Sequence, residues 1–273
     1  MFSSKNCAKG HHKPKTPAEE QAKVKELRTV LGPLSGRSLI FCTDDCLARY
    51  LRARDWNVEK AEKMLKEALK WRASYKPEDI RWDDIRKEAA TGKMYKLDLR
   101  DKVGRPVIGV RFANQTTDDM KGHIKHLVYT MENAIINFLP GQEQTVWLVD
   151  LKGWSIGKLG VFEAKDTIYI VQTMYPERLG HCFLLDPPRV FEPFFNLIKR
   201  FLEPATANKL HFVYTNRPES FNALEELLDM DKLVSEFGGN NSSTFNLLEY
   251  EDKMRQDDIK TAKYWSGPTK IDS

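Results

Sequence analysis

The strongest constraint on the fold is a change of hydrophobic period near residue 90. From Pro17 to about Ala90, apolar residues recur every three or four positions, which is typical of amphipathic helices. Beyond this point, short continuous apolar runs alternate with helical segments. Such runs indicate a largely parallel sheet covered by helices, because parallel strands are buried on both faces. The chain is therefore predicted to be an α/β protein with an all-helical N-terminal subdomain.

Capping residues mark the helix starts in the N-terminal segment. Thr16 precedes a first helix, which the Gly32-Pro33 pair ends. Thr43 is expected to cap a second helix and Asn57 a third. A short fourth helix is expected around Trp82.

The second segment begins with a predicted hairpin, in which residues 94–98 pair with 106–110 across a turn. The elements expected after it are helices over 118–139, 159–174 and 192–202, and strands over 145–151, 182–186 and 210–214. The regions predicted in this way are a flexible basic tail (1–16), a helical subdomain (17–90), an α/β lobe (91–240) and an extended polar C-terminal tail (241–273).

Charge and cysteine content limit the class of protein. The net charge is +4, and four lysines without an acid fall in the first fifteen residues, which leaves 39 basic against 39 acidic residues. A nucleic-acid-binding domain would carry a basic excess of its own, so we expect no nucleic-acid partner. Four cysteines in 273 residues do not make a disulfide framework. No apolar run approaches the roughly 20 residues that span a bilayer. We expect a soluble, cytoplasmic monomer.

One pentapeptide matches a nucleophile motif of hydrolases. Residues 153–157 (GWSIG) follow a predicted strand, and Asp186 and His211 come later in the order Ser, Asp, His. However, Ser155 does not directly follow the strand, and His211 lies within a predicted strand. An esterase that uses Ser155 stays the enzymatic alternative.

The sequence contains no complete metal or nucleotide motif. His123 and His126 share a predicted helix, and Cys42 and Cys46 straddle a helix start, but neither pair has the further ligands that a metal site needs. A P-loop and a G-x-G-x-x-G loop are both absent from the sequence. We expect neither a metal nor a cofactor.

The segment over residues 190–202 is unusual because its apolar residues cover more than one face of the predicted helix. A surface helix normally buries a single stripe. Two interpretations stay open, a helix buried in the core and a lid between an apolar ligand and a membrane.

Six short motifs resemble, in this order, those of the CRAL-TRIO lipid-binding family, and most closely those of its yeast-type phosphatidylinositol transfer proteins, including the small plant members. They are Leu51-Arg52-Ala53-Arg54-Asp55-Trp56, Trp71-Arg72, Asp150-Leu151-Lys152-Gly153, Tyr175-Pro176-Glu177-Arg178, Phe201-Leu202-Glu203-Pro204 and Phe237-Gly238-Gly239. The resemblance covers roughly residues 20–240.

This resemblance implies a phospholipid cavity in the α/β lobe, closed by a gate helix over about 188–202. The apolar gate residues would be Phe191, Phe194, Phe195, Ile198 and Phe201. The resemblance also implies a headgroup site at Arg54, Glu177, Thr206 and Lys209. Lysine and a hydroxyl suit a phosphate, and a carboxylate accepts hydrogen bonds from inositol hydroxyls.

One position departs from the family pattern. The phosphatidylcholine site of the family uses two small hydroxyl residues on the strand before residue 150. Thr145 keeps one, as a possible contact for a second lipid, but Trp147 occupies the other. The identity of a second lipid is therefore open.

The function expected from the resemblance is binding of phosphatidylinositol, with exchange at a membrane or presentation to a lipid-modifying enzyme such as a lipid kinase. It involves no covalent catalytic step. The alternative within the family is a carrier of another apolar ligand, such as a sterol, tocopherol or retinoid. Arg54, Glu177 and Lys209 disfavour that alternative, because an apolar ligand leaves these groups without partners.

Overall fold

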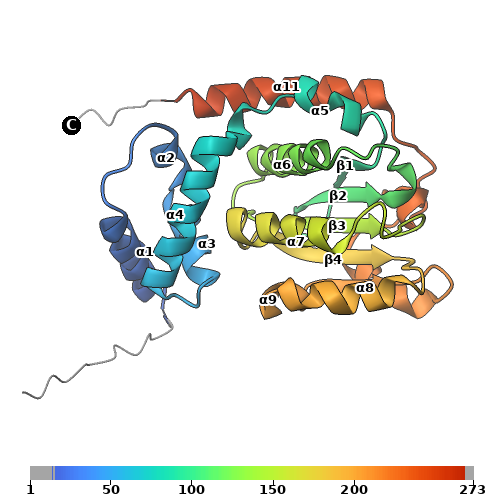
Figure 1. Cartoon of the computed structure of the whole chain (residues 1–273), viewed down its shortest axis with the longest axis horizontal. Coiled ribbons are helices and arrows are strands. Elements are labelled where there is room, and N and C mark those ends of the chain that lie inside the picture. Colours follow the sequence, from blue (N-terminus) through green and yellow to red (C-terminus); the bar gives the residue numbers. More distant parts are fainter. Residues whose placement is uncertain (1–13, 15, 268–273) are drawn as a thin grey trace, which may run out of the picture. The chain divides into compact units, whose positions relative to one another are not determined.

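The computed structural model describes residue 14 and residues 16–267 and divides into two compact units (Figure 1). One unit extends to Ala73, and the other comprises Ser74–Gly267. The predicted basic tail, residues 1–16, lies outside the described residues except for Pro14 and Thr16. Within the described part, every helix is too short or too polar to cross a membrane.

The first unit is helical, as predicted. Its elements are α1 (Pro17–Leu31), α2 (Gly36–Phe41), α3 (Asp44–Arg52) and α4 (Val58–Tyr75), of which the last two residues belong to the second unit.

All three predicted caps are confirmed. The side chain of Thr16 accepts from the backbone N–H of Glu19, that of Thr43 from Cys46, and that of Asn57 from Lys60. Helix α2 was not predicted; none of its six residues is buried, so it leaves no periodic signal in the sequence.

The second unit contains a five-stranded sheet in the order β1-β2-β3-β4-β5. The pairing of β1 with β2 is antiparallel and the other three pairings are parallel, which confirms the hairpin and the mostly parallel sheet. The arrows of β2, β3 and β4 point the same way in Figure 1. The strands are β1 (Met94–Arg100), β2 (Pro106–Arg111), β3 (Thr145–Asp150), β4 (Leu179–Leu185) and β5 (Leu210–Val213).

Helices and short turns of helix precede, connect and follow the strands. The longer ones are α5 (Trp82–Ala89), α6 (Met120–Ile136), α7 (Val161–Tyr169), α8 (Phe191–Ile198), α10 (Asn222–Leu227) and α11 (Leu247–Trp265). The short ones are η1 (Pro77–Asp79), η2 (Phe112–Asn114), a π-helical turn η3 (Ile170–Met174), η4 (Lys199–Phe201), α9 (Pro204–Ala207), η5 (Pro218–Phe221) and η6 (Ser235–Phe237).

One face of the sheet lies under α6 and α8. The strand register places Phe212 of β5, Val149 of β3 and Lys96 of β1 on this face. Phe212 meets Phe195 of α8 in a T-shaped contact at 5.1 Å, and the ammonium of Lys96 donates to Asn133 of α6 at 2.7 Å. We call this side the gate face.

Phe237 of the Phe237-Gly238-Gly239 motif packs on the opposite face, near Gly109 and Tyr95. A side chain at Gly109 of β2 would meet the ring of Phe237, so glycine is needed for this close approach. Gly238 follows η6 with φ of 90°, a conformation that favours glycine. The motif therefore has a packing role on the side of the sheet away from the gate face.

The extended C-terminal tail predicted over 241–273 is wrong for residues 247–265, which form α11. Asn246 caps this helix, and Tyr250 and Met254 bury its apolar side. The helix packs on α5 and α6. Its few apolar residues are widely spaced among charged ones, so the sequence reads as polar.

The domain boundary predicted at residue 90 stays a prediction, while the two compact units of the structure divide between Ala73 and Ser74. Helix α5 packs on α6 and α11 and so belongs with the sheet. The sequence placed it in the helical subdomain because it lies before the first strand.

We predict that Asp257→Ala destabilises the protein by about 3 kcal/mol, because Asp257 is a buried carboxylate and the variant leaves its partners unpaired. Its oxygens accept from Lys96, Asn133, Asn137 and Lys260. Urea unfolding measures the change. Asp252→Ala, an exposed position on the same helix, should stay within about 0.5 kcal/mol.

The pH dependence of this loss has a defined sign. Burial alone would raise the pKa of Asp257, but the charge of Lys96 and hydrogen bonds from Lys260 and Asn133 hold it below its usual value. A lowered carboxyl pKa stabilises the fold above the unfolded-state value of about 4, and this stabilisation disappears as the pH falls through the folded-state pKa. The difference between wild type and Asp257→Ala should therefore shrink at acid pH. A difference that stays constant would contradict this assignment.

Candidate functional site

Glu177 and Lys209 meet at one edge of the sheet. Glu177 lies just before β4 and Lys209 just before β5, and these strands are parallel neighbours. The ammonium of Lys209 lies 3.6 Å from a carboxylate oxygen of Glu177. About a quarter of each side chain is exposed, 23% for Lys209 and 25% for Glu177. Thr206 lies one turn before Lys209, whose N–H donates to the Thr206 carbonyl at 3.0 Å. Three of the four predicted headgroup residues thus lie together.

The backbone around this pair is firmly positioned. The carbonyl of Lys209 accepts from the N–H of Cys182 at 2.8 Å, which joins the start of β5 to β4. Glu177 has φ of 59°, in the left-handed region that non-glycine residues rarely adopt. Residues held in this region are often functional, because strain persists only where the surrounding structure enforces it.

Arg54 lies in the helical unit, in the turn after α3, where its guanidinium donates to the carbonyl of Ala53 at 2.7 Å. Its part in a headgroup site stays a prediction.

Thr145 is fully buried at the start of β3, with its hydroxyl already bonded. The hydroxyl donates to the carbonyl of Arg178 at 3.0 Å and accepts from the indole N–H of Trp147 at 2.9 Å. Trp147, which replaces the small residue of the family pattern, therefore forms a hydrogen bond within the protein. Contact of Thr145 with a second lipid remains untested.

The gate segment was predicted to be one helix over about 188–202, and the structure differs. It consists of α8 over eight residues and a turn of 3₁₀-helix, η4. Phe191, Phe194 and Ile198 are buried, whereas Phe195 and Phe201 are part-buried. On the outer side, Val190 and Leu197 are 65% and 45% exposed. The segment is therefore apolar both where it packs and where it meets solvent.

The two ends of the gate segment are attached differently. At the start of α8, Trp154 lies 5.0 Å from Phe191 and 4.7 Å from Phe194, ring centre to ring centre. At the far end, Gln172 donates to the carbonyl of Phe201 at 3.0 Å and accepts from the N–H of Glu203 at 2.8 Å. The start is thus held by aromatic contacts and the end by two hydrogen bonds.

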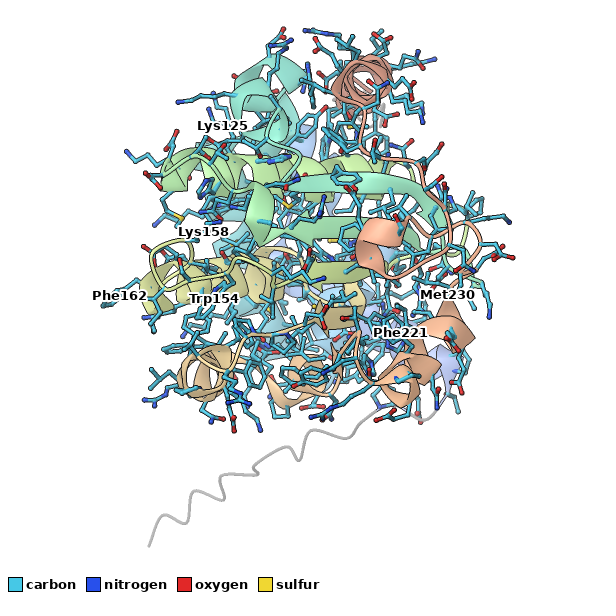
Figure 2. The ribbon with its side chains drawn as sticks, turned by 90° about the vertical axis from the view of Figure 1, so that its right-hand side faces the viewer. Lys125, Trp154, Lys158, Phe162, Phe221 and Met230 are labelled. Carbon is cyan, nitrogen blue, oxygen red and sulfur yellow. The ribbon has the colours of Figure 1, made fainter. Side chains whose placement is uncertain are left out.

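Trp154 and Gln172 are two residues whose roles the sequence did not reveal. Figure 2 looks toward the carboxyl ends of the parallel strands, where Trp154 lies among other side chains and Phe162 projects at the edge. Gln172 lies in the π-helical turn η3, a feature often found at functional sites. Irregular helix of this kind has no clear sequence signal.

The gate face keeps accessible apolar surface in the middle of the sheet. Trp147 and Val149 of the central strand β3 are part-exposed on this face. Val146 and Leu148, which point the other way, are completely buried. The gate face therefore keeps partly exposed apolar side chains at the centre of the sheet.

The hydrolase hypothesis finds no support among the hydrogen bonds of the described residues. His211 pairs with His181 at 3.0 Å, and Asp186 accepts from Thr215. Neither is hydrogen-bonded to Ser155, which is exposed. The structure does not bring the predicted triad together.

The two histidines of α6 are core residues. Burial lowers the pKa of His126 to about 3, so its imidazole is neutral. His123 lies beside Glu88 and Thr117. In the described part, no group of three or more metal-ligating side chains is found.

We predict that Trp154→Ala loosens the start of the gate. Loss of the two ring contacts should cost about 3–5 kcal/mol of folding stability. Amide hydrogen exchange should rise in residues 191–195 more than in 199–203, because the Gln172 hydrogen bonds remain. Phe162→Ala is the matched control, since Phe162 is 82% exposed. An equal rise in amide hydrogen exchange over residues 191–203 would contradict the different attachment of the two ends.

Comparison with known proteins matches two domain families to the chain. The CRAL/TRIO domain matches residues 90–239, and the CRAL/TRIO N-terminal domain matches residues 14–67. The first match alone covers more than half of the 273 residues.

Curated relatives include proteins of fungi and of mosquitoes. A CRAL-TRIO domain-containing protein of Schizosaccharomyces pombe is 36% identical over 73% of this chain and 19% of its own length. The phosphatidylinositol transfer protein CSR1 of Eremothecium gossypii is 30% identical over 74% and 48%. The SEC14 cytosolic factor of Yarrowia lipolytica is 30% identical over 83% and 49%. The chain spans half or less of the length of these three relatives.

Among solved structures, Sfh5 superposes with a TM-score of 0.66 over 92% of this chain and 98% of its own, at 14% identity. This similarity supports the fold.

Proposed function

The chain belongs to the CRAL/TRIO family, and we propose that it carries phosphatidylinositol in an apolar cavity on the gate face and exchanges it at membranes. The observation that carries the proposal is the convergence of Glu177 and Lys209, which lie 32 positions apart in the chain. We also propose that the protein works in the cytoplasm, with transient membrane contact, and supplies a lipid-modifying enzyme such as a lipid kinase.

The geometry of the pair suits a polar headgroup. At 3.6 Å, the two charged groups attract each other but are too far apart for a hydrogen bond. Lys209 therefore keeps donors for a phosphate, with the Thr206 hydroxyl nearby along the chain, and Glu177 keeps acceptors for inositol hydroxyls. A sterol or retinoid would offer these charged groups few partners, which favours the phospholipid.

A cavity lowers the barrier to moving a lipid through water. Exposing about 30 methylenes of two acyl chains costs on the order of 20 kcal/mol at about 0.8 kcal/mol each. Apolar surface such as that of Trp147 and Val149 would offset much of this cost, while α8 closes over the chains. The proposed activity needs no bond to be made or broken.

The first experiment is mass spectrometry of lipid bound after incubation with mixed liposomes. Phosphatidylinositol at about one per chain would support the proposal. A sterol, another phospholipid, or an empty protein would contradict the assignment of the headgroup residues.

We predict that Lys209→Ala and Glu177→Gln each reduce phosphatidylinositol transfer between vesicles at least about tenfold, which corresponds to the loss of one charge-assisted contact. Folding stability should change by no more than about 1 kcal/mol, because the pair is partly solvated. The matched control is Lys152→Ala, which removes the lysine of another ion pair, with Asp186 at 3.5 Å. Unfolding of the Lys209 or Glu177 variants would favour a structural pair instead.

Glu177→Gly separates binding from stability more sharply. Glycine adopts φ of 59° without the strain of a larger residue, so this variant should be at least as stable as wild type in urea. It should nevertheless lose transfer, because it has no carboxylate. A stable variant with full transfer would show that Glu177 does not bind the headgroup.

A further inference from the structure

We propose that a groove at the carboxyl end of β5 binds the phosphate of a bilayer lipid and thereby docks the start of α8 on anionic membranes. The groove encloses about 440 Å³ and lies between α8 and the end of β5. Its lining includes Arg189, Arg217, Glu192, Phe195, Phe212 and Tyr214. We call it the docking groove.

Two guanidinium groups supply the positive charge. Arg189 is exposed just before α8, and Arg217 lies 5.0 Å above the ring of Tyr214, which positions its side chain. Among the described residues, neither arginine has an ion pair with an acid. Guanidinium binds phosphate oxygens in a two-pronged geometry, and the groove contains one opposing carboxylate, Glu192.

Aromatic rings form the apolar part of the groove. Phe212 is 38% exposed although it belongs to the sheet, and it meets Phe195 edge to face. Together with Tyr214, these rings offer an apolar surface beside the two cations. A molecule that complements this surface carries a phosphate next to an apolar portion.

The neighbouring surface favours a bilayer as the source of that phosphate. Val190, which directly precedes α8, and Leu197 on α8 are exposed, and both are sequence neighbours of residues that line the groove. Over residues 187–202, three basic residues oppose one acidic residue. A bilayer would cover these apolar side chains together with the groove, whereas a soluble phosphate or a phosphopeptide seated in the groove would leave them in water.

This groove is separate from the Glu177–Lys209 pair. Lys209 precedes β5 and Tyr214 follows it, so the intervening strand separates them by more than about 13 Å at 3.3 Å per residue. The inference rests on the proposed function, because a lipid carrier must dock on a membrane. The docking groove and the headgroup site can nevertheless be tested separately.

The test is co-sedimentation of the full chain with phosphatidylcholine vesicles, with and without phosphatidic acid. Arg189→Gln/Arg217→Gln should weaken binding to the acidic vesicles about tenfold or more and should reduce its salt dependence. Lys60→Gln/Lys63→Gln removes the same charge from exposed positions of α4 and should have little effect. Phe212→Ser should weaken binding without changing the net charge. Thermal melting confirms that each variant is folded.

Three results would overturn the proposal. The first is an equal loss of vesicle binding in the arginine and the lysine double variants. The second is arginine-dependent binding of inorganic phosphate or a phosphopeptide without binding of vesicles. The third is unchanged vesicle binding by the folded arginine variant.

Lipid loading separates this result from the proposed function. The arginine variant should still load phosphatidylinositol, whereas Lys209→Ala should lose loading and keep vesicle binding. If Lys209→Ala loads normally, the headgroup assignment fails while the docking result stands.

Discussion

The parallel pairing of β4 with β5 is the constraint on which the two polar sites depend. Because both strands run in the same direction, the residues that precede them lie at one edge and those that follow them lie at the other. Glu177 and Lys209 therefore meet, although they are distant in sequence. The same strand direction carries Tyr214 and Arg217 to the opposite edge, beside the start of α8. A shift of β5 by one residue would turn Phe212 away from the gate face and would remove its contact with Phe195.

The gate helix is held by interactions of different kinds at its two ends. The hydrophobic part of aromatic contacts such as those of Trp154 is non-directional, and it weakens when an apolar environment, such as a bilayer, becomes available to the same rings. The hydrogen bonds of Gln172 are directional, and a buried carbonyl or N–H is costly to leave unpaired. Under the proposed function, opening from the start of α8, with a hinge near η4, would therefore cost less than release of the whole segment.

The sequence predicts most of the fold and part of the site, for identifiable reasons. Caps such as Thr16 act within one turn, and the apolar strands are continuous, so both leave local signals. Helix α11 was missed because a buried carboxylate, Asp257, does much of its anchoring, and its partners come from distant segments. The headgroup residues came from motif resemblance, while Trp154 and Gln172 act through contacts that depend on the tertiary fold. No spacing in the sequence encodes such contacts.

The positions of the two sites suggest how docking and release could be linked. The docking groove lies beside the start of α8, the end held by aromatic contacts, whereas α9 carries Thr206 just beyond the hinge. A phosphate held by Arg189 would act on the mobile end and leave the headgroup residues in place. The bilayer would then receive the apolar side of α8 as it separates from Trp154, so the aromatic surface passes from protein to lipid without full exposure to water. This arrangement would restrict opening to the membrane surface, which is where exchange needs it.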